Sequence, residues 1–428
     1  MLSRSTFSRN APRALQKQCS ATGVSSRRGM ASAATPGLQY DVSESAGVKV
    51  ANREVAGPTS TLALVAKAGP RYQPVPGFSD ALEQFAFKST LKRSALRINR
   101  EVELLGGEVS STHSRENVVL KAKFLSGDLP YFAELLAEVA SQTKFAAHEL
   151  SEVVLKTLNI TPSTTVPLEK YLSAEALAEY AQQAFAKSNI ALVGSGASSA
   201  DVSKWVGDFF KAVPSGAQLQ SAASKYYGGE QRISTKAGNA LVIAFPGSGA
   251  FGTSAYKPEA SVLAALLGGE SSIKWTPGFS LLAQATQGFS QVRASTQNLT
   301  YSDAGLFTIA LSGKADQITS AGKNAVDLLK KVAAGEIAGE EIKKAVALAK
   351  FRALESAQTL ETGLEATGSA LINGSKPYQI GEVAQSIDAV TEAQVKDVAK
   401  SFLSGKASVA TVGDLFQLPY GEDLGLTV

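Results

Sequence analysis

One pattern occurs twice in this sequence, once in each half of the chain. Near the end of the first half, a helix-like segment that begins with Ser, residues 173–185, precedes a strand-like run ending in Val-Gly at 193–194. Near the end of the second half, a segment that begins with Thr, residues 391–402, precedes a run ending in Val-Gly at 412–413. Ser and Thr are favoured N-cap residues, and short runs rich in β-branched residues are typical of strands. The repeat therefore predicts two domains with one shared fold.

The beginnings of the two halves also correspond. Leu62 lies in a strand-like run and Asp80 opens a helix-like segment 18 residues later. Leu241 and Glu259 hold the same two positions in the second half, again 18 residues apart. Since 428 residues exceed what one hydrophobic core accommodates, we predict an α+β protein of two homologous domains, each a mainly antiparallel sheet packed with helices.

The first copy of the repeat is shorter than the second. The interval from Leu62 to Gly194 is 132 residues, whereas the matching interval from Leu241 to Gly413 is 172 residues. The shortfall of about 40 residues falls between 158 and 167, and an omitted exon or a trimmed loop would each explain it. We predict these boundaries: a transit peptide at 1–30, a first domain at 38–214, a linker at 215–228 and a second domain at 229–428.

The N-terminal segment carries the excess of basic residues. Residues 1–40 contain six Arg or Lys residues and no Asp or Glu, which is typical of a mitochondrial transit peptide. Arg28 precedes the expected cleavage after Met30, in the range 28–36. Removal of residues 1–30 leaves 36 basic and 38 acidic residues, so the mature chain has no electrostatic footprint for nucleic acid. The alternative is a basic tail that stays on the protein.

Cysteine content and hydropathy argue against cysteine-dependent sites and a membrane-spanning protein. The single cysteine, Cys19, lies in the predicted transit peptide, so the mature chain would have no disulfide, thiol nucleophile or thiolate metal site. No run of 18 or more apolar residues occurs, which predicts no membrane-spanning helix.

The clearest candidate site is an incomplete zinc motif on a predicted helix. Inverted zinc peptidases use H-x-x-E-H, where two His hold the metal and the Glu activates water. Asp80, Glu83 and Gln84 occupy these positions, so they share one helix face but lack both imidazoles. The two histidines, His113 and His148, lie outside the motif and do not restore a zinc pair.

A structural role accounts for the same residues. Asp80 at the N-cap with Glu83 three residues later would form a capping box. Asp80 can bind a metal ion, but Gln84 is a weak oxygen donor. We therefore predict capping and packing here, with no catalytic residue and no metal.

A glycine-rich loop at 247–252 reads G-x-G-x-x-G after a predicted strand. In a dinucleotide site the helix opens at this loop so that its N-terminus meets the pyrophosphate. Four residues intervene here before Pro258, the predicted first helical residue. We interpret the loop as a structural connection and predict no cofactor.

Several phrases of the sequence together resemble the pitrilysin-like M16 peptidase family: the segment 77–90 with its Phe-Lys-Ser-Thr ending, Gly-Gly-Glu-Val at 106–109, and the helical region 129–158. The resemblance implies a third zinc ligand, a Glu, at the position of Thr157, and Leu150 stands where a second acidic residue is expected. Of the family's constellation only Glu83 remains, which implies an inactive member.

Two further phrases, at 165–172 and 188–193, resemble fungal inactive mitochondrial members of the family that belong to respiratory complex III, the ubiquinol–cytochrome c reductase. That resemblance implies a scaffold on the matrix side of the inner membrane, with core protein 1, cytochrome b, cytochrome c1 and the Rieske protein as partners. It implies no nucleic-acid partner.

Other functions remain open at this point. The non-catalytic alpha subunit of the mitochondrial processing peptidase is the alternative, but its presequence-handling glycine-rich loop is reduced here to Gly278 and Gly288 within 275–291. An active zinc peptidase or a nucleotide-dependent enzyme are the remaining alternatives, and bound zinc or dinucleotide would support them.

Overall fold

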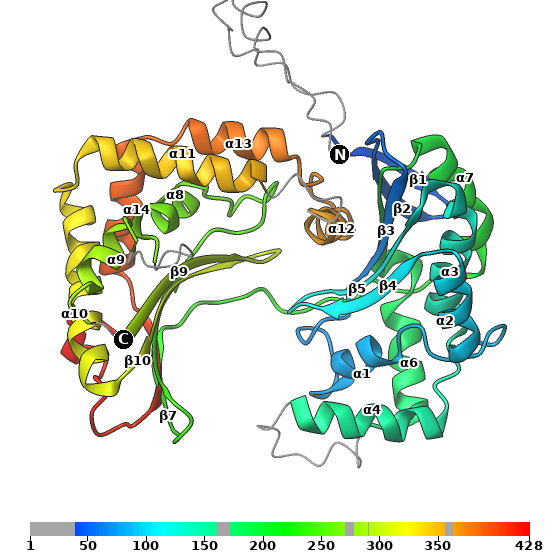
Figure 1. The fold of residues 1–428 in the computed structure, drawn as a ribbon, viewed down its shortest axis with the longest axis horizontal. Helices are drawn as coiled ribbons and strands as arrows, with labels where there is room; N and C mark the ends of the chain where they lie inside the picture. The colour runs from blue at the N-terminus through cyan, green and yellow to red at the C-terminus, as the bar shows by residue number, and fades with distance from the viewer. Residues whose placement is uncertain (1–38, 161–171, 270–277, 290, 356–362) are drawn as a thin grey trace, which may run out of the picture. The chain divides into compact units, whose positions relative to one another are not determined.

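The structure is a computed structural model that describes residues 39–160, 172–269, 278–289, 291–355 and 363–428, with backbone only at 154–160. It contains a six-stranded and a five-stranded sheet, each mixed and packed with helices, which confirms the predicted α+β class. In Figure 1, α2, α3 and α7 lie on one side of the first sheet, and α10 and α14 lie on one side of the second.

The first sheet has the strand order β1-β2-β6-β3-β5-β4, and only β2 and β6 run parallel. Its strands are β1 Asp41–Ser45, β2 Val48–Arg53, β3 Thr59–Ala66, β4 Glu108–His113, β5 Val118–Leu125 and β6 Ile190–Ser195. Its helices are α1 Phe78–Phe85, α2 Ala95–Leu104, α3 Leu129–Gln142, α4 Ala147–Ile160, α6 Ala174–Ala184 and α7 Ser199–Phe209, with 3-10 turns η1 Ser126–Asp128, η2 Lys187–Asn189 and η3 Phe210–Ala212.

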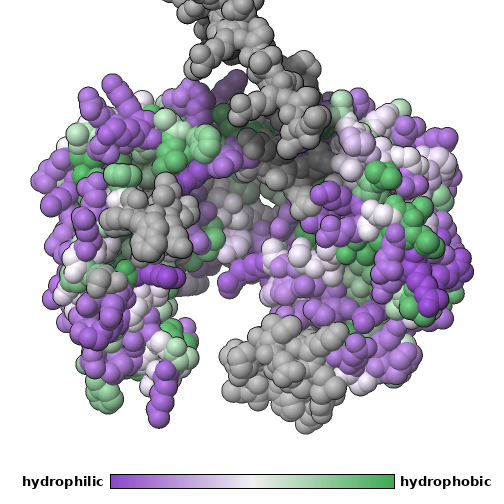
Figure 2. All heavy atoms as spheres, viewed as in Figure 1, coloured by the Kyte–Doolittle hydropathy of each residue, from purple (hydrophilic) through white to green (hydrophobic). Residues whose placement is uncertain are grey.

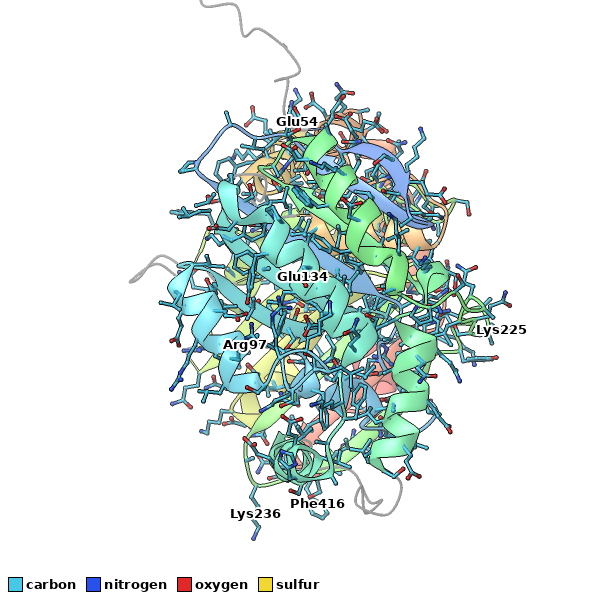
Figure 3. All side chains as sticks on the ribbon, turned by 90° about the vertical axis from the view of Figure 1, so that its right-hand side faces the viewer. Glu54, Arg97, Glu134, Lys225, Lys236 and Phe416 are labelled. Carbon is cyan, nitrogen blue, oxygen red and sulfur yellow. The ribbon has the colours of Figure 1, made fainter. Side chains whose placement is uncertain are left out.

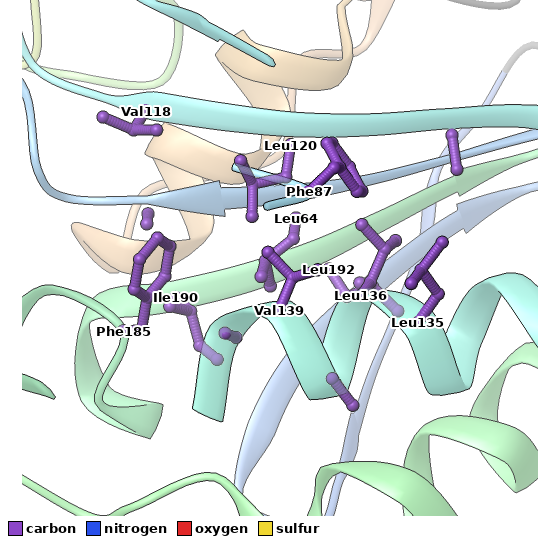
Figure 4. Packing of buried hydrophobic residues seen from close by; sticks show 14 of the residues in the cluster. Leu64, Phe87, Val118, Leu120, Leu135, Leu136, Val139, Phe185, Ile190 and Leu192 are labelled. Carbon is purple, nitrogen blue, oxygen red and sulfur yellow. The ribbon is translucent and has the colours of Figure 1, made fainter. Parts of the chain in front are cut away.

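One face of the first sheet forms a core with these helices. Leu64, Leu120 and Leu192 come from three neighbouring strands, and they lie against Leu135 and Val139 of α3 (Figure 4). All five are buried. The apolar positions recur at helical spacing in α3 and at every second residue in the strands, which is why the sequence pattern identifies these elements.

The second sheet has the strand order β7-β11-β8-β10-β9, and only β7 and β11 run parallel. Its strands are β7 Gly229–Ser234, β8 Asn239–Pro246, β9 Val292–Thr300, β10 Gly305–Gly313 and β11 Ser408–Gly413. The helices of this half are α8 Pro258–Leu267, α9 Leu281–Thr286, α10 Ala315–Ala334, α11 Gly339–Glu355, α12 Leu364–Ile372, α13 Ile380–Asp388 and α14 Glu392–Ser404, with a 3-10 turn η5 Glu422–Leu424.

The strand pairings repeat from one sheet to the other. β2, β6, β3, β5 and β4 correspond in order to β7, β11, β8, β10 and β9. The parallel pair occupies the same place in both, and Ser173 and Thr391 are N-caps of the matching helices α6 and α14. Strand β1 has no counterpart among the described residues of the second half.

Helix α12 belongs to the second half of the sequence but packs on the first sheet. Leu364, Leu371 and Ile372 form a buried cluster with strand residues such as Ala63 and Val193, on the face opposite the α3 core. A Cβ at Gly368 would lie 2.4 Å from Val65 Cγ2. Glycine therefore permits the close approach of this helix to β3, and the first sheet is buried on both faces.

The surface of the described residues is mainly polar. Figure 2 shows hydrophilic residues over most of the visible face, with hydrophobic residues in separate patches. Within the described ranges, no helix combines the length and apolar character that a membrane crossing requires.

Candidate site at the incomplete zinc motif

Helix α1 carries the motif, but it begins earlier than the sequence predicts. Its first residue is Phe78 and its N-cap is Gly77, which has φ 104° and makes no side-chain cap hydrogen bond. Asp80 is thus the third helical residue, and the predicted capping box at Asp80 and Glu83 is wrong. Glycine tolerates this N-cap because it lacks the Cβ that disfavours positive φ.

The structure brings His113 onto the motif. His113 ends β4, and its Nδ1 is hydrogen-bonded to the Glu83 carboxylate. Its Nε2 lies 3.8 Å from Asp80 Oδ1. Ser111 Oγ donates to the backbone carbonyl of Glu83 at 2.8 Å, which fixes α1 to β4. A histidine 30 residues from Glu83 in the sequence therefore contacts the one residue of the zinc motif that remains.

This cluster does not make a metal site in the described part of the chain. No group of three or more His, Cys, Asp or Glu residues there has the arrangement to hold a metal ion. Glu83 and His113 are hydrogen-bonded to each other through one carboxylate oxygen and Nδ1. Thr157 lies within α4, and its side chain is outside the described residues.

The other sequence candidates keep structural roles. His148 is an exposed residue near the start of α4. The glycine-rich loop lies between β8 and α8, and α8 begins at Pro258, as predicted. Ser248 within this loop donates from its backbone N–H to Asn298 at 3.2 Å, and its Oγ accepts from Lys257 N at 2.7 Å. These bonds fix a connection rather than an open phosphate cradle.

The region 275–291 is partly outside the described residues, at 275–277 and 290. Its described part is formed by the short helix α9, with Ser280 as N-cap. Gly278, at φ 105°, precedes this helix, and Gly288 follows it.

Residues 87–90, the Phe-Lys-Ser-Thr phrase, are held by two buried carboxylates. Ser89 Oγ donates to Glu149 at 2.7 Å. Thr90 Oγ1 donates to Glu138, which is only 2% exposed and is paired with Arg93. A buried carboxylate without such partners would be costly, so these contacts are required for the fold of the segment.

Arg93 extends this network to the surface. It pairs with Glu101 at 3.1 Å and with Glu134 at 3.2 Å, and Arg97 pairs with Glu101 at 2.6 Å. Figure 3 shows Arg97 on α2 and Glu134 on the neighbouring α3. Burial and the Glu101 carboxylate raise the pKa of Tyr131, which donates to Glu101 at 2.9 Å.

A second polar cluster surrounds Arg71, in the loop after β3. Its guanidinium donates to Glu116 at 2.6 Å and to both oxygens of Asp303 at 2.7 and 2.6 Å. Asp303 lies in the turn between β9 and β10, 232 residues away in sequence. Arg71 also donates to Ser221 Oγ at 2.7 Å and to the Ala222 carbonyl at 3.1 Å. One side chain therefore joins three distant segments.

The charges of this cluster shift its pKa values in the expected directions. Hydrogen bonding to Arg71 lowers the pKa of Asp303 below its ordinary value, and the bond to Asp303 raises the pKa of Arg71. Burial, then the nearby Arg71, lowers the pKa of Lys67, whose Nζ lies 4.9 Å from the Tyr72 ring. The cluster borders a cavity of about 1450 Å³ that His113, Arg115, Lys225 and Lys257 also line.

Three features were not predicted from the sequence: the contact of His113 with Glu83, the Arg71 cluster, and the packing of α12 on the first sheet. Each joins residues far apart in the chain, and none has a characteristic spacing. Arg93, which follows the Phe-Lys-Ser-Thr phrase at 87–90, gave a weak signal of the Glu138 contact, because a buried carboxylate needs a cationic partner.

Comparisons with known proteins agree with this architecture. Residues 49–185 match the family model of the insulinase peptidase family M16, and residues 171–348 match the M16 inactive domain. A Neurospora crassa protein named cytochrome b-c1 complex subunit 2, mitochondrial, is 46% identical over 459 residues, covering 100% of both chains. Proteins of the same name are 38% identical in Cryptococcus neoformans, over 89% of this chain and 93% of the relative, and 28% identical in Homo sapiens, over 88% and 90%.

Proposed function

The chain belongs to the M16 peptidase family, and we propose that it is subunit 2 of the mitochondrial cytochrome b-c1 complex, respiratory complex III, with a structural, non-catalytic role. The observation that carries this proposal is the full-length match at 46% identity to a relative of that name. The match to the inactive M16 domain agrees with it. The chain is therefore a member of a peptidase family that is not itself an enzyme.

We infer that loss of the zinc ligands is the cause of the missing activity. Asp80 and Gln84 stand where imidazoles would hold the metal. The remaining Glu83 is hydrogen-bonded to His113, which occupies the carboxylate that would otherwise activate a water molecule. Thr157 in place of a Glu would complete the loss.

The location follows from the same proposal. The protein is mitochondrial, and we propose that it lies peripherally on the matrix side of the inner membrane. The basic N-terminal segment 1–30 supports import, since it has the composition of a transit peptide. Its partners are other complex III subunits, and we propose core protein 1, cytochrome b, cytochrome c1 and the Rieske protein among them.

The domain boundaries at 30, 38–214, 215–228 and 229–428 are part of the proposal. Two sheets of matching strand order support them. The alignment to the Neurospora protein runs over 459 residues, whereas this chain has 428. At least 31 aligned positions thus face a gap in this chain, and we propose that this gap is the shortening of the first domain.

The test is native gel electrophoresis of inner membranes solubilised in mild detergent, with the protein tagged at its C-terminus. We expect the tag to co-migrate with the b-c1 complex and to remain there after partial purification. A tag found only in a soluble fraction would reject the proposal. A soluble heterodimer with a partner carrying H-x-x-E-H would indicate the processing-peptidase alpha subunit instead.

A further inference from the structure

Strand β7 forms one edge of the second sheet, and its outer side has free backbone groups. The N–H of Gly229 donates to the Ala407 carbonyl at 3.2 Å, and that of Thr235 donates to the Gly413 carbonyl at 3.3 Å, both toward β11. Because successive residues of a strand point their backbone groups to opposite sides, Glu230, Arg232 and Ser234 direct their N–H and C=O groups outward. Among the described residues, no hydrogen bond reaches these outward groups.

The first sheet has a strand at the corresponding edge. β1 pairs antiparallel with β2, with Asp41 opposite Asn52 and Val42 opposite Ala51. Matching β6 with β11 by their Val-Gly endings places Ala51 at the position of Ile233 and Asn52 at that of Ser234. The outward groups of β7 therefore correspond to those of β2 that β1 satisfies.

The side chains at this edge differ as well. Ala51 is buried in the cluster that α12 covers, whereas Ile233 is 49% exposed. An apolar side chain at mid-strand on an open edge is unfavourable in an isolated protein, because it promotes pairing with another chain. The residues before β7 belong to the segment 215–228, which is extended and does not return to form a hairpin.

The C-terminal segment of the chain covers one side of β7 but not its edge. Arg232 donates to the carbonyls of Leu415, Leu418 and Pro419 at 2.8–3.0 Å, and its guanidinium lies 3.8 Å from the Tyr420 ring centre. These contacts order β7 without using its outward backbone groups. Phe416 is fully exposed and, with Lys236, projects from the body of the protein (Figure 3).

We propose that the outer edge of β7 binds an extended segment of another subunit of the b-c1 complex, which completes the sheet as a sixth strand. This inference rests on the proposed function, because it takes the partner from that complex. β1 defines the chemistry of the segment: at least five residues, antiparallel to β7, without proline, and with an apolar side chain opposite Ile233. Backbone hydrogen bonds supply the affinity, and the contact with Ile233 sets the register.

Hydrogen–deuterium exchange on the purified complex tests the proposal, with the isolated protein as reference. We expect the amides of Glu230, Arg232 and Ser234 to exchange more than about tenfold more slowly in the complex. The amides of Gln231 and Ile233, which point to β11, should be protected in both samples. Equal, rapid exchange of the outward amides in the complex would overturn the proposal while leaving the membership in the complex intact.

A matched pair of variants adds a second measurement. Ser234→Pro removes one outward N–H, which an edge strand tolerates in the free protein, and Ser234→Ala keeps that N–H. We expect both to unfold at the wild-type temperature when isolated, and the fraction of Ser234→Pro retained in the complex to fall about tenfold relative to Ser234→Ala. Equal retention of two folded variants would contradict the proposal.

Two further outcomes separate the possible sources of failure. If the wild-type chain does not enter any large assembly, the proposed function fails before the edge is tested. If the outward amides become protected in the isolated protein as its concentration rises, a second copy of this chain occupies the edge, which overturns the assignment to another subunit.

Discussion

The contact between α12 and the first sheet offers a sharp test, because one glycine permits it. A Cβ at Gly368 would lie 2.4 Å from Cγ2 and 2.6 Å from Cβ of Val65. Val65 is fully buried on a central strand and cannot rotate away freely. Gly368→Ala should therefore force α12 away from β3, at an overpacking cost of about 1–3 kcal/mol.

The control is a glycine in the next helix. Gly381 lies in α13, and a Cβ added there would have no atom within 4 Å. Both substitutions improve helix propensity, by up to about 1 kcal/mol. The difference between the two variants therefore isolates the clash with Val65, because the propensity gain has the same sign in both.

A buried thiol reports the opening of α12 directly. Ala63 is fully buried in the cluster that contains Leu364 and Leu371. In a chain lacking residues 1–30, Ala63→Cys would be the only thiol, since Cys19 is removed. A cost of 1–3 kcal/mol corresponds to a rise of about 5- to 150-fold in the rate of thiol labelling in Gly368→Ala. Equal labelling rates in the Gly368→Ala and Gly381→Ala backgrounds would refute this account of the contact.

Two other predictions follow from the ionic contacts, and a third follows from the incomplete zinc motif. The bond to Arg71 lowers the pKa of Asp303, so its ionised form stabilises the fold above an ordinary carboxyl pKa near 4, and this contribution is lost as the pH falls through the lowered value. Asp303→Asn should reduce the unfolding temperature at pH 7, and the gap to wild type should narrow below about pH 4; a gap that stays constant in the scan would contradict the assignment. Glu138→Ala removes the buried carboxylate that Thr90 and Arg93 contact, while Arg93 keeps its other carboxylate partners, and it should lower the free energy of unfolding in urea by about 1–3 kcal/mol. Lys330→Ala at the exposed pair with Asp327 should be nearly neutral. We expect elemental analysis to find no stoichiometric zinc and EDTA to leave the unfolding temperature unchanged; a chelator-dependent decrease would restore a metal site.

The sequence allowed the prediction of elements whose signals are local. Helices α6 and α14 lie close to the predicted segments 173–185 and 391–402, α3 lies in the predicted helical region 129–158, and strands β3 and β8 contain Leu62 and Leu241 as predicted. Helical and strand periodicities operate over a few residues, so they can be read from the chain alone. The repeat then assigned both halves to one architecture, since each matching pair of elements supports the other.

The failures concern residues whose partners are distant or whose backbone is unusual. Helix α1 begins earlier than predicted because its N-cap is Gly77, which adopts a positive φ. The prediction chose Asp80 because Asp is a favoured N-cap residue. The pairing of His113 with Glu83 depends on the register of β4 against β5, which no short-range pattern encodes. The partner of Arg71 could not be predicted either, because Asp303 lies 232 residues away in the turn between β9 and β10.

The outer faces of the two sheets differ in how they are covered. On the first sheet, Ala63 lies beneath α12 and is fully buried. Its counterpart on the second sheet, Val242, is only half-buried. Helix α12 lies in the segment between α11 and α14, and the matching segment of the first copy is the one that we propose to be about 40 residues shorter. A second copy of α12 would be the helix that packs on the second sheet, so the proposed shortening accounts for the exposure of the face around Val242.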